Sequence, residues 1–121
     1  MYYEEHKPDA VVNVLGSEYG IYMNVTEADD DNMKTMDGYC DKTARRIAIA
    51  KLGDDCNLAD STVYIKGVLR HEIIHAFLFE SGLNGNSVWH VDGQEHPEQM
   101  VEWLAVQFPK ILNVFQEVGV L

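Results

Sequence analysis

The pattern of apolar and polar residues changes along the chain, from short strand-like runs in the first half to helical spacing in the second. Residues 10–15 and 19–26 are rich in β-branched and aromatic side chains, and the turn residues Gly16 and Ser17 lie between the two runs. Runs of this kind, joined by a short turn, predict a β-hairpin.

A second hairpin is predicted from residues 37–50. Residues 37–41 lead into a polar turn at residues 41–43, and residues 45–50 form the return strand, in which Ile47 and Ile49 alternate with Arg46 and small residues. We therefore expect a small antiparallel sheet made of two hairpins, with about four strands.

A long helix is predicted over residues 61–81, because this segment is apolar on nearly every side, as expected of a helix that crosses a core. Asp60 or Ser61 is a suitable N-cap, and Gly82 is well placed to end the helix. This helix is the natural candidate for the centre of the domain.

The last segment predicts a second long helix. Pro97 fits its first turn, and Pro109 is expected to kink the helix or split it in two. The apolar positions recur at helical spacing: Met100, Val101, Leu104, Ala105, Phe108, Ile111, Leu112 and Phe115. Strands followed by helices indicate an α+β fold, with the helices on one face of the sheet.

The length of 121 residues is that of one domain, which we expect to span residues 1–121. The chain carries 9 basic and 20 acidic residues, a net charge of −11, which argues against a nucleic-acid partner. Neither a secretion signal nor an apolar run of membrane-spanning length is visible. Cys40 and Cys56 form no C-x-x-C pair, so free thiols and a cytoplasmic location are expected.

The strongest chemical signal is the H-E-x-x-H sequence from His71 to His75, inside the first predicted helix. Residues four apart on a helix share one face, so the two imidazoles can bind one Zn²⁺ ion per chain. Glu72 is displaced sideways from that face and is expected to act as the catalytic general base on a metal-bound water.

A catalytic zinc site needs a third protein ligand and an open position for water. We expect Glu102, because it lies among apolar positions of the last helix, where an unpaired carboxylate would be costly. His90 or His96 could take its place as ligand, or could stabilise the reaction intermediate from outside the coordination shell. Glu98, one turn before Glu102, is an auxiliary candidate that could orient a ligand.

Tyrosines are further auxiliary candidates, because a hydroxyl near the metal can hydrogen-bond the developing oxyanion. Tyr39 and Tyr64 are the two candidates of this kind. We expect the strand at residues 45–51 to lie at an edge of the sheet, where an extended peptide or protein substrate could add to it as an extra, antiparallel strand.

On these residues the chain resembles the zincin-like (gluzincin) metallopeptidases, in particular the small intracellular ImmA/IrrE-type group and, more distantly, SprT-like proteins. The resemblance is carried by His71–His75 and by residues 102–108, which look like the helix that supplies a glutamate ligand in gluzincins. Residues 38–41 and 46–49 are similar to the hairpin that precedes the active helix. Most of the chain also resembles short phage and prophage proteins that share the sequence around His71.

This resemblance implies a minimal zincin-like metalloprotease fold and a zinc-dependent peptidase in the cytoplasm of a bacterial or phage-infected cell. Two other functions stay open on the sequence: a non-catalytic zinc-containing binding protein of phage origin, and a zinc hydrolase of non-peptide amides. A closed zinc site would favour the first of these, and a deep closed pocket the second. The oligomeric state is not predicted.

Overall fold

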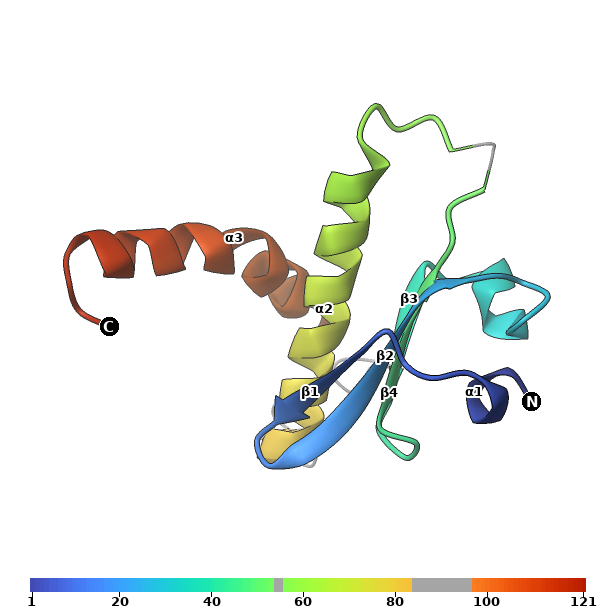
Figure 1. Cartoon of the computed structure of the whole chain (residues 1–121). Helices are drawn as coiled ribbons and strands as arrows, with labels where there is room; N and C mark the ends of the chain where they lie inside the picture. Colours follow the sequence, from blue (N-terminus) through green and yellow to red (C-terminus); the bar gives the residue numbers. More distant parts are fainter. Residues whose placement is uncertain (54–55, 84–96) are drawn as a thin grey trace.

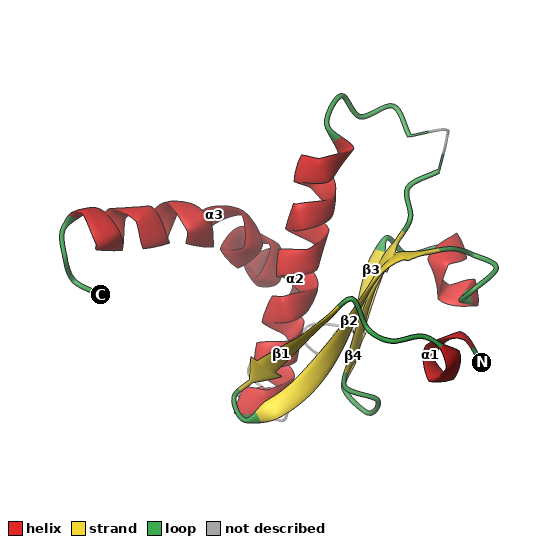
Figure 2. Cartoon of the chain, viewed as in Figure 1, coloured by secondary structure: helices red, strands yellow, loops and turns green. Residues whose placement is uncertain are grey.

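The computed structural model describes residues 1–53, 56–83 and 97–121 of the chain (Figure 1). Four strands and two long helices form most of this part, with two short helical turns beside them (Figure 2). The elements are, in order, α1 (Tyr2–Glu5), β1 (Ala10–Val14), β2 (Ser17–Val25), the 3-10 helix η1 (Asp31–Lys34), β3 (Gly38–Asp41), β4 (Arg46–Ala50), α2 (Ser61–Ser81) and α3 (Glu98–Glu117).

The four strands form one sheet in the order β1-β2-β4-β3. Both predicted hairpins are present as antiparallel pairs, β1 with β2 and β3 with β4. The sheet is nevertheless mixed rather than antiparallel throughout, because β2 and β4 pair in parallel. The α+β class predicted from the sequence is confirmed, and the purely antiparallel sheet is corrected.

The composition of β4 explains this arrangement. Its residues Ile47, Ala48, Ile49 and Ala50 are all buried, so both faces of the strand are covered. A strand that is apolar on both faces belongs in the interior of a sheet, whereas the partly exposed β3 can lie at the edge. Residues 45–51, which we expected at an edge, therefore lie between β2 and β3.

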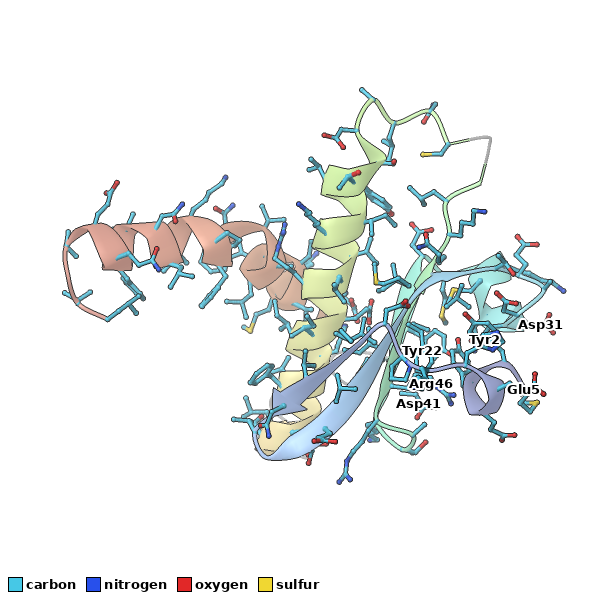
Figure 3. All side chains as sticks on the ribbon, viewed as in Figure 1. Tyr2, Glu5, Tyr22, Asp31, Asp41 and Arg46 are labelled. Carbon is cyan, nitrogen blue, oxygen red and sulfur yellow. The ribbon has the colours of Figure 1, made fainter. Side chains whose placement is uncertain are left out.

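The two faces of the sheet carry different layers. One face packs against α2, and its buried residues are Val14, Tyr19, Ile21, Ile47, Ile49 and, from the helix, Ala76. The opposite face is covered by tyrosines around Val25, Met33, Ala48 and Ala50. Figure 3 shows Tyr2, Tyr22 and Arg46 on this opposite side, away from α2.

Helix α2 begins and ends as the sequence predicts. The Asp60 carboxylate accepts hydrogen bonds from the backbone N–H groups of Thr62 and Val63, and Gly82 ends the helix in the left-handed conformation with φ of 88°. The helix packs on β3, β4 and β1. Gly38 of β3 permits the close approach, because a Cβ atom there would lie 2.9 Å from Cγ1 of Val68.

Helix α3 packs on α2, on the side away from the sheet, and its second half projects from the body (Figure 1). Pro109 lies inside this helix, which continues from Glu98 to Glu117 and is not split as one of our expectations had it. Pro97 immediately precedes the helix, one position before the first turn where we expected it. Within the described residues, no helix has the length and apolar character that a membrane span requires.

Candidate metal centre

His71 and His75 project from the same face of α2, as their spacing predicts. Their ring centroids lie 5.0 Å apart, and their side chains are only 19% and 12% exposed. Ala76, which follows His75, is fully buried in the core between α2 and the sheet. The helix therefore packs against the sheet next to the two histidines. The two imidazoles are thus fixed by the best-packed part of α2.

Glu98, in the first turn of α3, lies between the two histidines. Its Oε2 atom is 2.9 Å from Nε2 of His71, and its Oε1 atom is 2.9 Å from Nε2 of His75. One donor atom from each of these three side chains can be chosen so that all lie within 4.8 Å of one another. Two imidazoles and a carboxylate at this separation form a group that can bind a metal ion.

Glu102, our expected third ligand, is not part of this group. Its Oε1 atom lies 3.4 Å from Nδ1 of His71, the ring nitrogen that does not contact Glu98. Its side chain is 60% exposed, so the argument that burial would force it to find a partner does not hold.

The packing of α3 explains why Glu98 and not Glu102 lies between the histidines. Val101 and Ala105 are almost completely buried and define the stripe of α3 that faces α2. Glu98 is three residues before Val101 and seven before Ala105, so it belongs to the same stripe. Glu102 is displaced to the side of the stripe and reaches the outer nitrogen of His71.

Glu72 is the one buried charged residue among those that the structure describes, with 9% exposure. Burial raises the pKa of its carboxyl to about 7; the imidazole of His71 opposes this shift, and the nearby carboxylates Glu98 and Glu102 add to it. A carboxyl group with this pKa can accept and release a proton near neutral pH. Burial raises the pKa of the Cys40 thiol in β3 to about 12, and the nearby Glu72 carboxylate adds to this shift.

The two tyrosines expected as auxiliary groups lie in different surroundings. The Tyr39 hydroxyl donates to Asp30 and lies 3.2 Å from the Tyr3 hydroxyl, within the cluster that covers the far face of the sheet. Tyr64 lies on α2, seven residues before His71, and its hydroxyl donates to Asp37. This bond, with burial, raises the pKa of Tyr64 to about 12, so the hydroxyl keeps its proton.

A cleft of about 1110 Å³ passes over these residues. One wall is the edge strand β3 with the turn that follows it, and the other walls come from α2 and the first half of α3. His71, Glu72, His75, Glu98, Glu102 and Tyr64 all line this cleft. The candidate metal group therefore opens onto a surface large enough for a molecule longer than a single amino acid.

The remaining predicted auxiliary residues, His90 and His96, lie outside the described residues. The position of Glu98 is the main feature that differs from the sequence-based expectation, which gave this residue only an orienting role. Glu98 lies three residues before Val101 and seven before Ala105, a spacing that places all three on one helix face. The sequence therefore contains a signal that Glu98 faces α2.

No protein-family model, no curated protein and no solved structure matches this chain.

Proposed function

We propose that this protein is a zinc-dependent metallopeptidase, with His71, His75 and Glu98 as the metal ligands and Glu72 as the general base. The observation that supports it best is the joint position of these four side chains in one cleft, where both histidines face the same carboxylate. The motif contributes the two histidines and Glu72, and the packing of α3 contributes Glu98.

The donor set fits zinc. Zinc is commonly held by histidine nitrogens and carboxylate oxygens, and catalytic zinc sites use three protein ligands with one position left for water. Zinc bound to these residues would polarise that water and lower its pKa towards neutrality. Glu102 would orient His71 through Nδ1, since metal-bound histidines usually donate their second N–H to a carboxylate or carbonyl.

Glu72 would take a proton from water as it attacks a carbonyl carbon, and would return that proton to the departing amine. Burial raises the pKa of the Glu72 carboxyl, which favours its acceptance of a proton from water. Both tyrosines line the cleft, and each hydroxyl donates to an aspartate. Tyr64 is the better candidate to donate to the carbonyl oxygen, because it lies on α2 two turns before His71, whereas the Tyr39 hydroxyl belongs to the cluster on the far face of the sheet.

We propose a peptide or protein segment in extended conformation as the substrate. β3 is the edge strand beside the cleft, and an extended peptide can pair with an edge strand through backbone hydrogen bonds. Residues 38–41 replace residues 45–51 in this role, since β4 is paired on both sides. The cleft beside an edge strand favours a peptidase over a hydrolase of small amides, and the buried Glu72 in that cleft favours a peptidase over a binding protein without catalysis.

The test begins with the metal. The purified chain should contain about one zinc ion, and His71→Ala and His75→Ala should each lose it and lose hydrolysis of an unfolded, fluorescently labelled protein. His6→Ala is the matched control, because His6 is exposed and stacks on Tyr2 rather than lying near the cleft. Retention of zinc by a His71→Ala/His75→Ala double variant would refute the proposed site.

Zinc binding without hydrolysis of any unfolded protein would leave the metal site in place and reject the peptidase function. In that case the two alternatives separate readily. Hydrolysis of small amide substrates would identify the non-peptide hydrolase, and a total lack of hydrolysis would identify the binding protein.

A further inference from the structure

Pro109 creates an unmet hydrogen-bonding requirement in α3. In a regular helix, the backbone N–H of residue 109 would donate to the carbonyl of residue 105, but proline has no N–H. Ala105 is 1% exposed, so this carbonyl has little access to water. A buried carbonyl without a donor is costly, and such groups are nearly always paired.

Arg70 of α2 supplies the donor. Its Nε atom lies 2.7 Å from the carbonyl oxygen of Ala105, so a side chain of α2 is hydrogen-bonded to the backbone of α3. Arg70 immediately precedes His71, and Ala105 belongs to the stripe of α3 that faces α2 and also contains Glu98. The bond therefore joins the two helices beside His71 on α2 and two turns from Glu98 on α3.

We infer that Arg70 is a positioning residue for the proposed metal centre, which it serves by holding the Ala105 carbonyl and so fixing where Glu98 lies between His71 and His75. This inference rests on the proposed function. The small side chains of Val101 and Ala105 permit close contact between the helices, but contacts of this kind have little directionality. Without Arg70 the buried Ala105 carbonyl would have no donor, and a rotation of α3 that brought this carbonyl to water would move Glu98.

The continuity of α3 carries this effect to the metal centre. Ala105 is seven residues, or two helical turns, from Glu98, so a small rotation or shift at Ala105 is transmitted through a continuous helix to the carboxylate. Glu98 contacts both histidines at 2.9 Å, so it has little tolerance for displacement. Pro109 makes the position of α3 depend on Arg70, because it removes the N–H that would otherwise pair with this carbonyl.

A double-mutant cycle tests this inference on the full-length protein, with zinc affinity measured by competition with a coloured chelator. Arg70→Met should weaken zinc binding about tenfold, within the range found for residues that support metal ligands. In the Pro109→Ala background, alanine restores the N–H, and the same change at Arg70 should weaken binding less than about twofold. Pro109→Ala alone should keep the original affinity, because one carbonyl can accept two hydrogen bonds.

Arg45→Met is the matched control, because it removes the same charge from an exposed residue whose ion pair with Glu80 lies at the far end of α2. Its zinc affinity should be unchanged. Circular dichroism at the assay temperature should first establish that each variant is folded. An equal loss in both backgrounds, an equal loss in Arg45→Met, or no loss in Arg70→Met would each overturn the role of Arg70.

If Arg70→Met does not fold, the double variant decides. A folded Arg70→Met/Pro109→Ala protein with nearly normal zinc affinity supports the link between Arg70 and the freed carbonyl, and an unfolded or weakly binding double variant overturns it. If the unchanged chain binds no zinc, this inference and the proposed function both fail. If it binds zinc and Arg70 has no effect, only this inference fails.

Discussion

Two carboxylates on opposite sides of the sheet, Glu72 and Asp30, show how surroundings determine what an acidic residue can do. Glu72 lies between α2 and the sheet, where burial and neighbouring carboxylates raise its pKa to about 7. Burial alone would also raise the pKa of Asp30, but hydrogen bonds from Tyr3 and Tyr39 outweigh it and lower the pKa. The first carboxyl can exchange a proton near neutral pH, whereas the second stays ionised and joins parts of the fold.

Asp30 links the N-terminal segment to β3 through hydrogen bonds from two tyrosines. Tyr3 of the N-terminal segment donates to it at 2.5 Å, and the guanidinium of Arg46 stacks over the Tyr3 ring at 3.9 Å. Tyr39 adds a second donor from β3. A carboxylate that accepts several hydrogen bonds therefore stabilises structure, whereas a carboxylate buried near like charges is suited to catalysis.

The largest expected effect is on hydrolysis. Glu72→Gln should lower kcat/KM for an unfolded protein substrate by about 10²–10⁴-fold, because a glutamine cannot accept a proton from water. Asp30→Asn, the equivalent change on the other side of the sheet, should leave hydrolysis nearly unchanged at neutral pH. Zinc content should be measured in parallel, since Glu72→Gln should retain the metal. Equal losses in the two variants would abolish the distinction between the sites.

The next effect concerns which glutamate binds the metal. Glu98→Ala should weaken zinc binding by more than about 100-fold, since it removes the proposed third ligand. Glu102→Ala should weaken it by about tenfold, since it removes the group proposed to orient His71. Chelator competition measures both affinities. The opposite order would return Glu102 to the role that we first expected for it.

A third prediction concerns acid stability. Asp30→Asn should lower the free energy of unfolding by about 1–2 kcal/mol at neutral pH, because the asparagine loses charge-assisted hydrogen bonds with two tyrosines. Since the folded state lowers the pKa of Asp30, its contribution is complete above the unfolded value of about 3.9 and disappears as the pH falls below it.

Urea unfolding at several pH values checks this prediction. The stabilities of the original chain and of Asp30→Asn should differ at pH 7 and converge below about pH 4. A constant difference across this range would show that Asp30 contributes through shape alone and not through its charge.

The smallest expected effects separate the two tyrosines. Tyr64→Phe should lower kcat/KM about tenfold with little change in stability, since its side chain is partly exposed and lines the cleft. Tyr39→Phe should lower the free energy of unfolding by about 1 kcal/mol and leave kcat/KM unchanged, because its hydroxyl binds Asp30. Thermal unfolding and initial rates measure the two effects, and an exchange of phenotypes would contradict the assignment.

Much of the local structure could be predicted because it depends on neighbouring residues. The first hairpin turn was predicted at Gly16 and Ser17 and lies one residue earlier, at Leu15 and Gly16. The N-cap at Asp60 and the end of α2 at Gly82 follow from backbone preferences within a few positions. The order of the strands could not be predicted in the same way. It depended on how β4, apolar on both faces, could be covered by a helix on one side and by tyrosines on the other.

The spacing of the motif is enough to place His71 and His75 on one helix face with Glu72 beside it, because helical geometry relates residues four apart regardless of the rest of the chain. Three further features follow from the folded chain alone: Glu98 joins the histidines, Glu102 lies to the side, and Arg70 donates to the carbonyl freed by Pro109. These three features depend on the orientation of α3 about its own axis and on the angle at which it crosses α2. That geometry arises from packing between residues far apart in the sequence, to which no local spacing rule applies.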